Sequence, residues 1–245
     1  MYQEEEVWQE NGYDRLVPLY EEYWEQVVAL KKSNKKLSNP HLICFPDNFE
    51  KQNKRLVTIG QQTGPKQWHQ EIEIENNTGS ITELMEAYYE FEVGCYYNST
   101  FFQAVRKIEC MLHIDPCESL WTEIDKMDLG GRKADAITSK SIYDAFPVLG
   151  RELKIANPHV VIFFTGPTYD DLIKNTIFKG VEYKNVGDIP KEHFAQLSLP
   201  NSANSELPEK TYRTYHPYHL RISKHKLWHQ AFGEKGWFET ALLSS

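Results

Sequence analysis

Apolar and polar positions recur along the chain with two different periods, which predict strands and helices in turn. Short runs rich in β-branched and aromatic residues predict four strands, over residues 56–59, 119–124, 160–165 and 212–215. Helical spacing lies between and after them, over residues 80–93, 101–112, 141–155, 169–178 and 219–232. Alternating strands and helices are typical of a parallel sheet with right-handed crossovers. We therefore expect a three-layer α/β/α fold with a central, mainly parallel sheet of four to five strands.

The first part of the chain is expected to pack on this body as an amphipathic helix. Apolar side chains recur at intervals of three and four over residues 13–32. A connection with proline and asparagine follows, in which residues 42–45 suit either a short edge strand or an extended stretch. We expect one structural domain, with residues 1–49 as helix and connection and residues 50–245 as the α/β body. Within that body, residues 180–209 suggest an irregular excursion before the last strand.

The residues that follow each predicted strand are the first place to look for a ligand site. In parallel sheets the carboxyl ends of the strands lie at one edge, where the binding cleft forms. The sequence Gly-Gln-Gln-Thr-Gly-Pro, residues 60–65, follows the first strand. The other three ends carry Glu123, Thr165 with Gly166, and His216 with Pro217. All four ends therefore carry polar, glycine or proline residues, and we expect them to form one cleft.

These segments resemble the motifs of the uracil-DNA glycosylase superfamily. Residues 60–65 look like its first motif, Gly-Gln-Asp-Pro-Tyr-His in one branch and Gly-x-Asn-Pro-Gly in others. His216 and the following proline look like its second motif, a His-Pro loop that enters the minor groove. The resemblance covers residues 50–232. It departs at Gln62, where the family has a water-activating Asp or Asn, at Thr63, where it has Pro, and at Glu123, where an Asn usually reads uracil.

The resemblance implies a glycosylase that flips a nucleotide out of the stack and hydrolyses its N-glycosidic bond. Gln62 would orient the water, since an amide cannot take its proton, and His216 would stabilise negative charge on the departing base. The residues implied to bind the base are Gly60, Gln61, Thr63, Gly64, Trp68, Glu123, Thr165 and Gly166. Those implied to contact nucleic acid are Pro217, Tyr218, His219 and Arg221. An ionised Glu123 only accepts hydrogen bonds, so we expect a base richer in donors than plain uracil.

Simpler interpretations stay open for each part of this set. Residues 60–65 also suit a tight turn that needs glycine dihedrals, and His216 suits a loop histidine bonded to a carbonyl. Glu123 also suits a salt bridge, and Trp68 suits the core or its rim. At the level of function, the alternatives are a superfamily member that binds a base, nucleotide or nucleic acid without hydrolysis, and a hydrolase of small nucleosides.

Charge and cysteine content narrow the classes of partner. The formal net charge is -8, yet residues 210–233 contain Lys, Arg and His and no acid, so we expect DNA, another nucleic acid or a nucleoside as partner. The cysteines lack a Cys-x-x-Cys pair, which predicts reduced thiols and no metal, iron–sulfur cluster or other cofactor; they are Cys44, Cys95, Cys110 and Cys117. No stretch suits a membrane helix, and residues 1–10 do not suit a secretory signal. We expect a cytoplasmic monomer.

Overall fold

A six-stranded sheet forms the centre of the computed structural model, which describes residues 11–63, 69–74, 80–93, 98–199 and 207–243. Within these residues the strand order is β2-β1-β3-β6-β5-β4. The strands are β1 (Leu56–Gln62), β2 (Leu120–Asp125), β3 (Val160–Phe163), β4 (Glu182–Asn185), β5 (Phe194–Ser198) and β6 (Lys210–Thr214). β2, β1, β3 and β6 are parallel, whereas β5 is antiparallel to both β6 and β4. The chain is thus α/β with a mixed, mostly parallel sheet.

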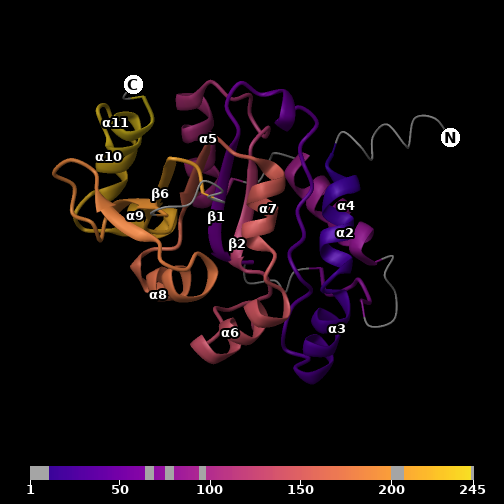
Figure 1. Cartoon of the computed structure of the whole chain (residues 1–245). Helices are drawn as coiled ribbons and strands as arrows, with labels where there is room; N and C mark the ends of the chain where they lie inside the picture. The colour runs from indigo at the N-terminus through magenta and orange to yellow at the C-terminus, as the bar shows by residue number, and fades with distance from the viewer. Residues whose placement is uncertain (1–10, 64–68, 75–79, 94–97, 200–206, 244–245) are drawn as a thin grey trace.

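Helices fill the connections between the strands. They are α2 (Tyr13–Glu21), α3 (Trp24–Ser33), α4 (Ser80–Val93), α5 (Thr100–Leu112), α6 (Ala136–Ala145), α7 (Leu149–Ala156), α8 (Asp170–Leu172), α9 (Pro217–Ile222), α10 (Leu227–Phe232) and α11 (Trp237–Leu243). Shorter helical turns are the 3-10 segments Phe49–Lys51 and Pro167–Tyr169 and the π segment Ile173–Ile177. Figure 1 shows α2, α3 and α4 at one end of the molecule and α9 to α11 at the other.

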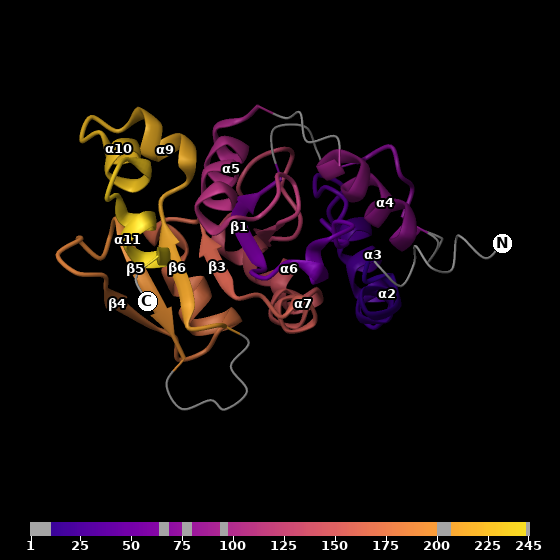
Figure 2. The same ribbon diagram turned by 90° about the horizontal axis from the view of Figure 1, so that it is seen from above.

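Side-chain contacts place helices on both faces of the sheet. Neighbouring residues of a strand point to opposite faces, so Trp121 and Thr122 mark the two sides of β2. Phe101 of α5 packs edge-on against Trp121, with ring centroids 6.3 Å apart. On the other side, Lys126 Nζ donates to Thr122 Oγ1 and to Glu152 of α7. Figure 2 shows α5, α9 and α10 together on one side of the strands.

Several predicted elements differ in their limits. The helix expected over residues 13–32 is two helices, α2 and α3, with a break at Glu22 and Tyr23, and both of these side chains accept hydrogen bonds from Arg151 of α7. The helix expected over residues 141–155 is also two, because Pro147 lacks an N–H and disfavours helical geometry in the residue before it. Residues 42–45 are an extended connection.

The expectation of an irregular excursion over residues 180–209 is wrong. This segment contributes β4 and β5, which add two antiparallel strands and bring the sheet to six instead of four to five. β5 is largely buried, and Phe194 stacks on Tyr212 of β6 with ring planes 8° apart. β4 is an exposed edge strand of polar residues, so its sequence carries no apolar alternation.

One cysteine differs from the expectation of reduced thiols. Cys44 and Cys110 are not disulfide-bonded, whereas Cys117 takes part in a disulfide bond. Cys95 lies outside the described residues. Among the helices in the described part of the chain, none combines the length and apolar character needed to cross a membrane.

Candidate functional site at the strand ends

The carboxyl ends of the four parallel strands bring most of the predicted site residues to one edge of the sheet. The register pairs Gly60 with Glu123 and Gln62 with Asp125 across β1 and β2. Gln61 Nε2 donates to the carbonyl of Thr165, which follows β3, at 2.8 Å. These contacts connect three of the four strand ends, and the fourth contributes His216, two residues after the end of β6.

Gly60 is required here for space. It lies inside β1, and a Cβ built on it would lie 2.3 Å from Glu123 Oε2. The carboxyl of Glu123 therefore occupies the volume that any other side chain at this position would need. The simpler interpretation, a tight turn that needs glycine dihedrals, does not apply to Gly60, because it is a strand residue whose φ is not positive.

Glu123 is a buried carboxyl without a partner on one of its oxygens. Glu123 is 6% exposed, and its Oε2 makes no hydrogen bond among the described residues. Burial raises the pKa of Glu123 to about 8, an effect that Lys126 opposes and Asp125 increases. At neutral pH Glu123 therefore carries a proton, and it can both donate and accept, as an amide does. This differs from the ionised acceptor assumed from the sequence, and the described residues give it no salt bridge.

Asp125, two residues further along the same strand, has a very different environment. Its Oδ2 accepts hydrogen bonds from Ser139 Oγ of α6 and from Tyr169 OH, each at 3.1 Å. The Tyr169 hydroxyl also lies 3.4 Å from Gln62 Oε1, and Lys133 Nζ lies 3.7 Å from the centroid of the Tyr169 ring. Burial raises the pKa of Asp125 to about 6, while the two hydrogen bonds and Lys133 limit the rise.

Asp125 was not among the residues predicted for the site. The signal was present in the sequence, because residues two apart on a strand share a face. Glu123 and Asp125 thus project toward the same side at the carboxyl end of β2. The strand register pairs Asp125 with Gln62 of β1, so a carboxyl lies beside this amide.

His216 is held as the N-cap of α9. Its Nδ1 accepts a hydrogen bond from the backbone N–H of Tyr218 at 3.3 Å, and its ring stacks on Phe101 with centroids 5.9 Å apart. Burial lowers the pKa of His216 to about 4, with a further contribution from His219. The imidazole is therefore neutral at pH 7, and because Nδ1 accepts, the proton is on Nε2, which is a hydrogen-bond donor.

The end of β3 supplies backbone groups. Thr165 is fully buried, and its Oγ1 has no hydrogen bond among the described residues. Gly166 has φ 71° and ψ 172°, a conformation that favours glycine, and its N–H donates to the carbonyl of Thr214 at 2.9 Å. This hydrogen bond joins the turn after β3 to the end of β6, two residues before His216.

Thr63 is engaged in a structural contact. It is 2% exposed, and its hydroxyl donates to Asp128 Oδ2 in the segment after β2 at 2.5 Å. The same carboxylate accepts from the N–H of Gly131. Thr63 therefore joins the loop after β1 to the loop after β2. The predicted residues Gly64 and Trp68 lie outside the described residues.

The segment after His216 presents basic and aromatic side chains. Tyr218 and Ile222 are each 58% exposed, and the Arg221 guanidinium lies 4.3 Å from the centroid of the Trp228 ring. Pro217 is buried, His219 is exposed, and so are Lys224 and Lys226. Arg213 does not extend this surface, because it is buried and forms a bidentate ion pair with Asp170 at 2.8 and 3.0 Å.

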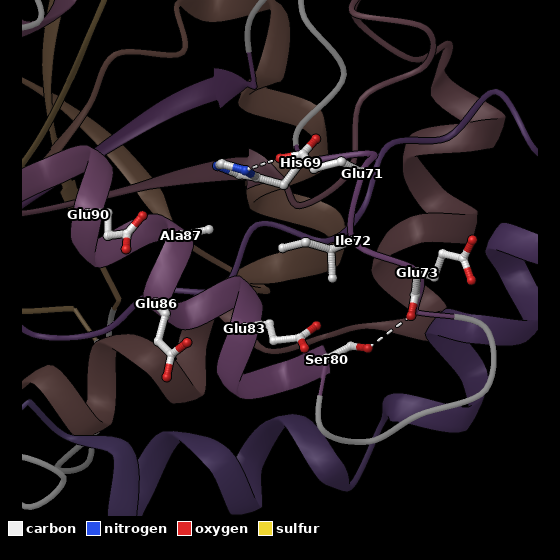
Figure 3. Close-up of a pocket in the computed structure, with 9 residues that line it drawn as sticks. All are labelled: His69, Glu71, Ile72, Glu73, Ser80, Glu83, Glu86, Ala87 and Glu90. Atoms are coloured by element: carbon white, nitrogen blue, oxygen red, sulfur yellow. Dashed lines mark hydrogen bonds and ion pairs between the residues drawn. The ribbon is translucent and has the colours of Figure 1, made fainter. Parts of the chain in front are cut away.

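The cavity in Figure 3 lies elsewhere. It has a volume of about 670 Å³ between residues 69–74 and α4, and none of the strand-end residues lines it. Its lining includes five carboxylates, Glu71, Glu73, Glu83, Glu86 and Glu90. His69 is paired with Glu71 at 2.8 Å. So many carboxylates repel a phosphate, and this cavity is unsuitable for nucleic acid.

No group of three or more His, Cys, Asp or Glu side chains within the described ranges is arranged to hold a metal ion. Comparison with known proteins gives no match, either to a protein-family model or to a curated protein sequence.

Proposed function

We propose that this chain is a glycosylase that hydrolyses the N-glycosidic bond of a flipped base, in the manner of the uracil-DNA glycosylase superfamily that its sequence resembles. The observation that carries this proposal is that an amide, two buried carboxyls and a histidine lie at the carboxyl ends of parallel strands along one edge of the sheet; they are Gln62, Glu123, Asp125 and His216. Parallel sheets bind ligands at this edge, and groups of these kinds can position water, accept its proton and stabilise charge on a leaving group.

His216 has the properties needed to stabilise the leaving base. The bond between C1′ and the base nitrogen breaks with its electron pair on the base, which gains negative charge. A neutral imidazole that donates from Nε2 stabilises such charge without losing a proton. The stacking on Phe101 and the bond from the Tyr218 N–H fix the orientation of the ring.

Base selection is proposed to depend on the protonation of Glu123. With its proton, Glu123 presents one donor and one acceptor, which match an edge with adjacent acceptor and donor such as that of uracil. Ionised, it only accepts and prefers a donor-rich edge. The preference against plain uracil expected from the sequence therefore belongs to the ionised state. The groups around this carboxyl are Lys126, Asp125 and Tyr169.

The main alternative is a protein that recognises a base or nucleic acid without hydrolysis. It is suggested by Gln62, an amide at the position where the superfamily activates water. The two proposals differ in one product, because only a glycosylase leaves an abasic site.

A panel of labelled oligonucleotides tests the proposal. Single- and double-stranded substrates carrying uracil, hypoxanthine, xanthine, mismatched or alkylated bases are incubated with protein and treated with alkali. We expect cleavage of at least one substrate, reduced about 100-fold or more in His216→Ala. His113→Ala, an exposed histidine directly after α5 and outside the basic segment of residues 210–233, is the control and keeps wild-type activity. Binding without cleavage on every substrate supports recognition instead.

A further inference from the structure

Gln62 and Asp125 lie side by side in the register of β1 and β2, and only one of them can accept a proton. Both hydrogen bonds to Asp125 engage Oδ2, one from Ser139 and one from Tyr169. Oδ1 accepts none from the described residues, so its lone pairs are available to a water. The carboxylate is thus fixed on one oxygen and open on the other, which suits a base that holds a nucleophile.

We propose that Asp125 is the general base of this site and that Gln62 and Tyr169 are positioning residues around it. This inference rests on the proposed glycosylase function and deepens it. Asp125 Oδ1 takes a proton from water, and the water oxygen forms the new bond to C1′. The bond from C1′ to the base nitrogen breaks, its electron pair leaves with the base, and the Nε2–H of His216 donates to the base as its charge develops.

The surroundings of Asp125 suit this role. Glu123 lies on the same strand, Lys133 and Tyr169 face it from neighbouring segments, and Ser139 comes from α6. A carboxyl with a pKa of about 6 is largely ionised at neutral pH and still basic enough to accept a proton. Glu123 is protonated under the same conditions, so the two carboxyls do not compete for one role.

The test is the single-turnover rate of base release, measured on the most reactive substrate of the panel. We expect Asp125→Asn to lower the rate about 100-fold or more and to retain substrate binding. Asp188→Asn, an exposed residue between β4 and β5, is the charge-matched control and keeps the wild-type rate. A rate for Asp125→Asn within about threefold of wild type would overturn the role of Asp125, while the glycosylase itself stands. No release by the wild-type protein overturns both.

A second variant tests the role without removing the carboxyl. The hydrogen bond from Ser139 lowers the pKa of Asp125, so Ser139→Ala raises it. We expect the acidic limb of the rate profile, where the base becomes protonated, to move to higher pH with a similar maximum rate. A purely structural role of Ser139 would lower the rate equally at every pH, and that result contradicts the proposal.

Discussion

At the residue scale, Glu123 gives the clearest consequence for stability. Its pKa in the folded protein is about 8, well above the ordinary value of 4.5 for a glutamic acid. Between these two values the folded state binds more protons than the unfolded state, so the free energy of unfolding falls as pH rises through this range. The contribution is fully present below pH 4.5 and is lost above about pH 8.

We therefore predict that Glu123→Gln flattens the pH dependence of stability. The wild-type contribution of this residue approaches about 1.4 kcal/mol per pH unit between the two pKa values. Denaturant unfolding at several pH values measures it, and Glu90→Gln, an exposed residue on α4, is the control. Equal slopes for wild type and Glu123→Gln would show that Glu123 is ionised or exposed in the folded protein.

Residue identities at the site were only partly predictable. His216 and Glu123 were predicted for the site because they lie at or just after the carboxyl ends of recognisable strands, and the structure places them there. Asp125 was not predicted, although it shares a strand face with Glu123, because its pairing with Gln62 and its hydrogen bonds from Ser139 and Tyr169 depend on the fold. The raised pKa of Glu123 was also unpredictable from the sequence, because burial causes it. The sequence does not show whether one particular carboxyl is buried.

At the element scale, a buried polar network connects the end of β2 with α7 and α2, on the face of the sheet opposite α5. Lys126 Nζ, directly after β2, lies 2.5 Å from Glu152 Oε2 of α7, and Tyr20 of α2 donates to Glu152 Oε1 at 2.8 Å. All three side chains are almost fully buried. Loss of one charged partner would leave the other charge buried and unpaired.

Glu152→Ala is predicted to destabilise the protein by about 3 to 5 kcal/mol, because the Lys126 ammonium loses its counterion. Asp144→Ala is the control, since it removes an exposed ion pair with Lys140 on α6 and is expected to cost less than about 0.5 kcal/mol. Chemical denaturation compares the two. Similar small losses for both variants would mean that Lys126 finds another partner or water.

Elements with a sequence pattern of their own were predicted in position, whereas breaks within helical patterns and strands that form only by pairing were not. The predicted strands and the helix at residues 80–93 match β1, β2, β3, β6 and α4 in position. β4 has the sequence Glu-Tyr-Lys-Asn and is mostly exposed, so it forms by pairing with β5 and carries no pattern of its own. Helix breaks at Pro147 and at residues 22–23 interrupt patterns that continue in the sequence.

At the scale of the whole molecule, the charge distribution bears on nucleic-acid binding. The net charge is -8, and the exposed cations Arg221, Lys224 and Lys226 lie in the segment that follows His216. Neutralised phosphates release counterions, so the logarithm of affinity falls with the logarithm of salt in proportion to the number of contacts. Binding by this acidic protein should depend strongly on those few cations.

We predict that combined replacement of these three cations by alanine reduces the slope of log affinity against log salt by about 3. Fluorescence anisotropy with a labelled oligonucleotide measures the slope. A control variant replaces three other exposed lysines by alanine: Lys32 in α3, Lys35 after α3 and Lys54 before β1. We expect this variant to leave the slope unchanged. An equal reduction in both variants would place the nucleic acid elsewhere on the surface.

The central claim is that the strand-end site breaks an N-glycosidic bond, and mass spectrometry of the products tests it most directly. Wild-type protein, Asp125→Asn and His216→Ala are each incubated with the oligonucleotide panel at pH 7, and free base is quantified against abasic strand. We predict equal amounts of free base and abasic strand for the wild type, and strong loss of both in the two variants. Folded wild-type protein that binds the oligonucleotides and releases no base from any of them would contradict the account.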